Sequence, residues 1–184
     1  MIKFTILGCG SSMGVPRADG YWGKCDHKET KNYRTRCSAI IQTKERNILI
    51  DTSPDLRFQL IKNKIQNIDT VLYSHMHGDQ VHGINDLRIF ALKNSKKIPI
   101  YADKLTRKYL LKNFSYCFKN SKDYKAILSI NDIKKNYYLK TRKRKILIKS
   151  IPVKHGLINS QSFIINESCA YISDANKIFK NNLK

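Results

Sequence analysis

Long apolar stretches are missing from this sequence. Apolar runs such as Ile146–Ile148 and Ala39–Ile41 are far too short to cross a bilayer. The first residues, MIKFTILGCG, indicate a strand that enters a glycine turn, and they lack the long apolar segment of a signal peptide. We therefore expect a soluble, cytoplasmic protein with no membrane partner.

Acidic residues are also scarce, with 14 Asp plus Glu against 35 Lys plus Arg, which gives a formal net charge of +21. Lysine supplies 26 of these cations and arginine only 9, and lysine offers a point charge rather than a bidentate fork. The excess reflects a compositional bias of the whole chain toward Lys, Ile and Asn, rather than a local cluster of basic residues. We expect only non-specific attraction to nucleic acid, with specific nucleic-acid binding as an open alternative.

The five cysteines are an odd number and are widely spaced, so they do not predict a disulfide framework. Cys25, His27 and Cys37 are ligand types that suit a small structural zinc site, although their spacing is not that of paired zinc knuckles. Ordinary reduced cysteines are the alternative interpretation, and both stay open at the level of sequence.

Length and patterning favour one α/β domain spanning residues 1–184, with 41% hydrophobic residues to form its core. The lysine-rich stretch 119–145 predicts a solvated connection with one amphipathic piece. The order of strands and helices indicates a layered α/β fold. Strands are expected over 3–7, 37–43, 46–51, 70–73, 98–101, 146–153, 162–165 and 170–173, and helices over 53–64, 84–92 and 106–118.

The strongest chemical signal lies in residues 74–83, SHMHGDQVHG, which hold three of the five histidines. His75 and His77, followed by Asp79, can converge on one ion if the backbone turns at Gly78. Imidazole and carboxylate groups are ligands that zinc and manganese prefer. The alternative is a polar loop with surface histidines.

Together with ILGCGSSMGVPR, NYRTRCSAII, ILIDTSPDLR and IPVKHG, this segment resembles the metallo-β-lactamase superfamily. Within it, the motifs are most similar to the phosphoribosyl cyclic phosphodiesterases of phosphonate metabolism, with ribonuclease Z as a more distant cousin. The resemblance implies an αββα sandwich and a metal-dependent hydrolase. It further implies phosphodiesterase activity on a small, anionic, cyclic phosphate ester.

The resemblance also implies a set of ligands. His75, His77 and His155 match the histidines of a first metal, and Asp174 matches the carboxylate that bridges two metals. Asp79 matches a carboxylate on the second metal, so Asp79 and Asp174 are the candidate catalytic residues. For Asp51 two interpretations stay open: it orients the metal loop, as in relatives, or it caps the following helix.

Two departures from the family pattern affect the second metal. Gln80 stands where the family has a histidine, and relatives continue beyond the length of this chain with a further ligand. We therefore expect an incomplete second half of the sandwich, one zinc or manganese ion, and impaired hydrolysis. The alternatives are an inactive remnant or half of a split enzyme, with a separate C-terminal chain or a homodimer as the partner.

Overall fold

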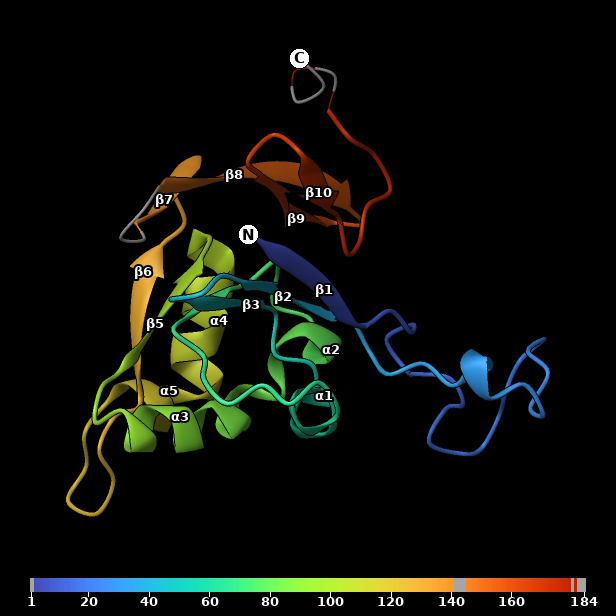
Figure 1. Ribbon diagram of the computed structural model, residues 1–184, viewed down its shortest axis with the longest axis horizontal. Coiled ribbons are helices and arrows are strands. Elements are labelled where there is room, and N and C mark those ends of the chain that lie inside the picture. The colour runs from blue at the N-terminus through green and yellow to red at the C-terminus, as the bar shows by residue number, and fades with distance from the viewer. Residues whose placement is uncertain (1, 141–144, 180, 182–184) are drawn as a thin grey trace.

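The computed structural model describes residues 2–140, 145–179 and 181. They form three layers, in which helices cover one face of a six-stranded sheet and a four-stranded sheet covers the other (Figure 1). This arrangement confirms the expected α/β fold class. Within these residues, no helix has the length and apolar character needed to span a membrane.

The first sheet has the strand order β1-β2-β3-β4-β5-β6. β1, β2 and β3 pair antiparallel, whereas β3 to β6 pair parallel. The parallel strands β3 and β4 are buried apart from Asn47, as expected where layers cover both faces of a sheet. The bounds are β1 Lys3–Gly8, β2 Ser38–Gln42, β3 Asn47–Ile50, β4 Thr70–Leu72, β5 Ile98–Ala102 and β6 Leu128–Asp132.

The helices are short, and two predicted helices are interrupted. The helix expected over 106–118 is divided at Phe114, which leaves the helical conformation with φ −124° and ψ 35°. The helix expected over 84–92 begins with a 3₁₀ turn. The bounds are η1 Thr30–Asn32, α1 Leu56–Lys62, α2 Gly78–Val81, η2 Ile84–Leu87, α3 Arg88–Lys93, α4 Lys104–Asn113 and α5 Ser115–Phe118.

The second sheet is antiparallel, in the order β10-β9-β8-β7. Its longest pairing joins β8 and β9 in register from Ile148↔Ile165 to His155↔Ile158. Gly156 follows with φ +55°, a conformation that favours glycine, so the hairpin turns directly after His155. The bounds are β7 Asn136–Lys140, β8 Lys145–His155, β9 Ile158–Ile165 and β10 Cys169–Tyr171.

The prediction of a solvated connection over 119–145 is wrong for much of that stretch. β6 pairs with β5 from Ile98↔Leu128 to Ala102↔Asp132, and β7 pairs with β8. The sequence pattern does not reveal β6, because this strand has only a few apolar positions and lies at the edge of its sheet. Residues 141–144 of the predicted connection lie outside the described residues.

Two apolar clusters hold the layers together. Leu49, Val71 and Ile100 face the helices, whereas Ile48 and Ile50 face the second sheet. This alternation is the period of two that a strand imposes. Because β4 is buried between both clusters, the point at which it ends is fixed, and the loop that follows starts from a rigid edge.

Residues 11–36 form an arm that extends away from the three layers (Figure 1). An isolated bridge between Val15 and Arg34 joins its two sides. At its base, the Arg36 guanidinium donates two hydrogen bonds, of 2.8 and 2.6 Å, to the carboxylate of Asp55. This ion pair anchors the arm to the start of α1.

Candidate metal centre

The histidine loop leaves β4 at Leu72 and is tied to the neighbouring segment 51–53. The Gly83 N–H donates to the Thr52 carbonyl at 2.9 Å, and the Thr52 N–H donates to the Gln80 carbonyl at 2.7 Å. A Cβ atom on Gly83 would lie 2.0 Å from the Ser53 carbonyl oxygen, so only glycine permits this close approach. The short helix α2 forms inside a region predicted as a loop, because one turn of helix leaves no periodic signal.

Three histidines converge at this edge of the sheets. His75 Nε2 lies 3.0 Å from His77 Nδ1, and His155 Nε2 lies 3.2 Å from the same His77 nitrogen. One ligand atom from each of the three lies within 4.8 Å of the others. His75 is buried, His155 is half-buried and His77 is exposed. The loop after β4 and the end of β8 therefore bring together residues that are far apart in the sequence.

The spacing and the donor set suit a zinc ion. Ligand nitrogens at 2.0–2.1 Å around a tetrahedral zinc lie about 3.3 Å apart, close to the separations in the cluster. Zinc binds the unprotonated nitrogen of a neutral imidazole. Burial, together with the neighbouring imidazoles His77 and His155, lowers the pKa of His75 to about 4. His75 is therefore neutral at physiological pH.

Asp51 holds His75 through Ser74. The Asp51 carboxylate accepts a hydrogen bond from the Ser74 N–H at 2.7 Å and another from the Ser74 hydroxyl at 2.8 Å. Ser74 Oγ also lies 3.0 Å from His75 Nδ1. When the hydroxyl donates to the Asp51 carboxyl group, its oxygen accepts from His75 Nδ1–H, which leaves His75 Nε2 free for a metal.

These contacts decide between the two interpretations of Asp51 in favour of the metal loop. The side chain of Asp51 contacts Ser74, not the first turn of α1, whose N-cap is Asp55. Asp51 is fully buried and adopts φ 60°, a conformation that Asp tolerates better than most residues. Burial raises the pKa of Asp51 to about 8.

The two predicted carboxylates meet around Gln80. The Gln80 side-chain Nε2 donates to Asp79 Oδ2 at 3.0 Å and to Asp174 Oδ2 at 3.3 Å. Neither carboxylate belongs to the compact histidine group. Asp79 and Asp174 therefore stay predictions as metal ligands and as catalytic residues. From the sequence, Gln80 was noted only as a departure from the family pattern. Its contact with Asp174 could not be predicted, because the two residues are 94 positions apart.

A structural zinc site at Cys25, His27 and Cys37 is not formed. Among the residues with described positions, the three histidines are the one group that brings metal ligands together. Cys25 and His27 are exposed on the arm, whereas the Cys37 thiol donates to the Gly10 carbonyl at 3.4 Å. All five cysteines are free, and burial raises the pKa of the Cys37 thiol to about 12.

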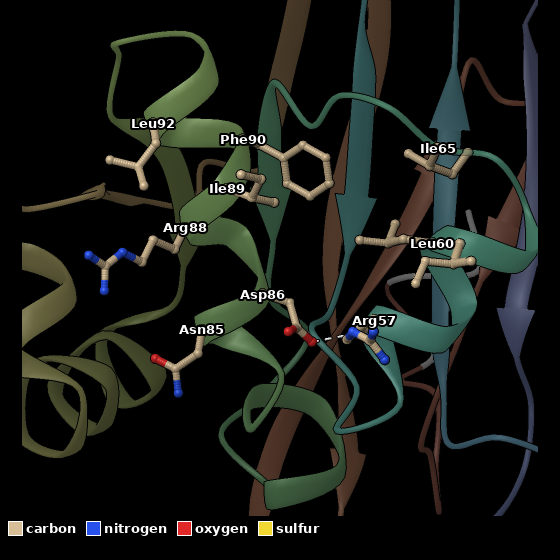
Figure 2. Close-up of a pocket in the computed structure, with 10 residues that line it drawn as sticks. Arg57, Leu60, Ile65, Asn85, Asp86, Arg88, Ile89, Phe90 and Leu92 are labelled. Atoms are coloured by element: carbon tan, nitrogen blue, oxygen red, sulfur yellow. Dashed lines mark hydrogen bonds between the residues drawn. The ribbon is translucent and has the colours of Figure 1, made fainter.

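A cleft of about 430 Å³ lies elsewhere, between α1 and the segment formed by η2 and α3 (Figure 2). Its walls are mainly apolar, with Leu60, Ile65 and Phe90 among them, and Asp86 accepts a hydrogen bond from the Arg57 N–H at its side. No histidine or cysteine lines this cleft. This cleft is therefore separate from the histidine cluster.

Comparison with known proteins places this centre in a family. Residues 46–182 match the family described as the β-lactamase superfamily domain. The chain belongs to the metallo-β-lactamase superfamily. The crystal structure of a diphosphatase from the PhnP family superposes with a TM-score of 0.82 at 26% identity, covering 100% of this chain and 69% of that one. The family assignment and its PhnP-like branch are thus confirmed.

Two curated relatives match at lower coverage of their own lengths. An octanoyltransferase of Porphyromonas gingivalis is 29% identical over 179 residues, which are 96% of this chain and 35% of that protein. A ribonuclease Z of Clostridium kluyveri is 26% identical over 102 residues, which are 54% of this chain and 28% of that protein. The chain spans about a third of the length of these curated relatives, so what they do as whole proteins does not transfer directly.

Proposed function

We propose that this superfamily hydrolase is a metal-dependent phosphodiesterase that acts on a small, anionic, cyclic phosphate ester. The single observation that carries the proposal is the convergence of His75, His77 and His155 on one point. Three histidine imidazoles form a typical protein ligand set for a catalytic zinc, which keeps a further position for water or substrate.

Each residue at the centre has a role in this proposal. The three histidines would hold zinc, or manganese in its place, and Asp174 would add a carboxylate. A bound ion of this kind supplies a water of lowered pKa and a Lewis acid for a phosphoryl oxygen. Ser74 and Asp51 keep the His75 ring oriented by their hydrogen bonds.

An anionic substrate suits the charge of the chain. The formal net charge of +21 produces a field that raises the local concentration of small anions. The names of two relatives, a diphosphatase and a ribonuclease Z, both describe cleavage at phosphorus. These observations support a phosphate ester over a neutral substrate.

We expect turnover to be slow. Two-metal hydrolases use a second ion to stabilise charge on the attacking or leaving oxygen, and here Gln80 occupies a position at which the family has an imidazole. Removal of one electrostatic stabiliser from an active site costs about 2.7–4 kcal/mol, or roughly a hundred- to a thousandfold in rate. An inactive remnant is the limiting case of this expectation.

The test is release of p-nitrophenol from bis(p-nitrophenyl) phosphate with added zinc or manganese. We expect slow release by the natural chain, lost in His77→Ala and reduced in Asp174→Ala. Release equal to that of His77→Ala would identify a remnant without metal-dependent activity. Turnover in the ordinary enzyme range of about 1–1,000 per second would show that the centre is not impaired.

Cleavage of RNA is a second candidate, because the chain matches ribonuclease Z over 102 residues and is strongly basic. Binding that depends on phosphate contacts weakens steeply as the salt concentration rises. Metal-dependent cleavage of a precursor transfer RNA at one position, lost in His77→Ala, would favour this candidate. Binding without cleavage, equal for all RNA sequences, would reject it.

A further inference from the structure

Gln80 is a fully buried amide between two carboxylates. Its Nε2 lies 3.0 Å from Asp79 Oδ2 and 3.3 Å from Asp174 Oδ2, and its Oε1 has no hydrogen-bond partner. These are the two carboxylates that the family resemblance assigns to the second metal. An amide thus occupies the position between them.

The orientation of this amide follows from the charge of its neighbours. A side-chain amide nitrogen carries two protons, and an ionised carboxylate only accepts hydrogen bonds. One N–H can therefore serve each carboxylate. The reverse orientation would set Oε1 against two carboxylate oxygens, with no proton between them. Leaving Oε1 unpaired costs about 1–3 kcal/mol, which indicates that the two hydrogen bonds determine the orientation.

We propose that the Gln80 amide replaces a second metal ion, so that the centre binds one ion at the histidines and none between Asp79 and Asp174. The uncharged amide joins the two carboxylates by hydrogen bonds, where a cation would join them by its charge. This inference rests on the metal site of the proposed function but not on its reaction.

A second ion does not fit the residues around Gln80. To admit one, the amide would have to give up both hydrogen bonds and turn Oε1 toward the carboxylates, and a neutral amide is a poor zinc ligand beside imidazole. The backbone of Gln80 is held at both ends, by donation of its N–H to the His77 carbonyl at 2.9 Å and by acceptance from Thr52 N–H at 2.7 Å. The residue therefore has little freedom to move aside.

The substitution Gln80→Glu tests this inference with almost no change in shape. It replaces the donor by an acceptor and places three carboxylates around one point. Only a bound cation or a proton relieves the repulsion among them. The matched control is Gln161→Glu. Gln161 is 9% exposed, and its Oε1 accepts from Ser150 Oγ at 2.8 Å, so a carboxylate there keeps the same hydrogen bond.

Each protein is equilibrated with excess zinc at neutral pH, desalted, and analysed for zinc per chain, with circular dichroism as the check on folding. We expect one zinc in the natural chain, two in Gln80→Glu and one in Gln161→Glu. Two zinc ions in the natural chain, or one in Gln80→Glu, would overturn the inference. If Gln80→Glu does not fold, Gln80→His, which supplies an imidazole, takes its place: two zinc ions per chain are expected, and one would overturn the inference.

The zinc count tests the inference about Gln80, whereas the hydrolysis assay tests the proposed function, and the two results can disagree. Two zinc ions with hydrolysis would overturn the inference and leave the proposed function in place. One zinc without hydrolysis would support the inference and reject the function. No zinc in the natural chain would overturn both, because the histidine cluster would then not be a metal site.

Discussion

The candidate centre has two sides that differ in what they offer a metal ion. On the histidine side, three ring nitrogens converge, and the Asp51–Ser74 pair orients the His75 ring through its Nδ1 atom. On the carboxylate side, Asp79 and Asp174 already have a shared partner in Gln80. On our proposal, proximity of ligand types is not sufficient for a cation site, which also needs lone pairs without a competing hydrogen-bond donor.

The largest effect is expected from His77→Ala, because His77 Nδ1 is the nitrogen that both other histidines approach. Two imidazoles do not hold zinc in the way that three do, so we expect stoichiometric binding to be lost. Isothermal titration with zinc measures it. His82→Ala is the matched control, since His82 lies in the same loop but packs against Phe114 with ring centroids 6.0 Å apart.

Undiminished zinc binding by His77→Ala would show that the histidine side is not the metal site. Equal loss in His77→Ala and His82→Ala would point to disruption of the whole loop instead. Either result would remove the contrast between the two sides of the centre.

Asp51→Asn should have the next largest effect. An asparagine amide can donate to Ser74 Oγ, which turns the hydroxyl proton toward His75 Nδ1 and favours the tautomer whose Nε2 is protonated. Loss of a group that orients a metal ligand costs about 10–100-fold in metal affinity. Competition with a chromogenic zinc chelator measures the change, with Asp69→Asn, at the opposite end of β4, as the control. Equal affinities for the natural chain and Asp51→Asn would contradict the orienting role of Asp51.

Only part of the site and of the fold could be predicted from the sequence. His75 and His77 were found from a local pattern, whereas His155 depended on family resemblance, because nothing near it in the sequence marks a ligand. β6 and β7 were missed because both are short strands with few apolar positions inside a lysine-rich stretch. The Arg36–Asp55 pair and the contact of Gln80 with Asp174 join distant segments, so only the folded chain reveals them.

Stability of the metal-free protein should depend on pH through Asp51. Its pKa is raised from 3.8 to about 8 by burial, so between these values the unfolded chain releases a proton that the folded chain retains. The stabilisation is therefore complete below pH 4 and is lost as pH rises toward 8, by up to about 1.4 kcal/mol per pH unit. Urea unfolding of the metal-free natural chain and Asp51→Asn, at pH 5 to 9, measures the difference. Parallel pH profiles would contradict the effect of burial on Asp51.

The smallest effect on zinc binding is expected from Asp79→Asn. On the carboxylate side this change weakens one hydrogen bond to Gln80, a loss of about 1 kcal/mol, which corresponds to less than a tenfold change in affinity. The same chelator competition applies. A loss as large as that in His77→Ala would mean that Asp79 is a ligand of the bound ion, and the two sides would then act as one site.

The central claim is that one ion binds at the histidine side and no ion binds between the carboxylates. X-ray absorption spectroscopy of the zinc-loaded natural chain tests it most directly. We predict imidazole scattering from three histidines with Zn–N distances of about 2.0–2.1 Å, and no zinc–zinc scattering. A zinc–zinc feature at about 3.5–4 Å, the separation in two-metal hydrolases, would contradict the account.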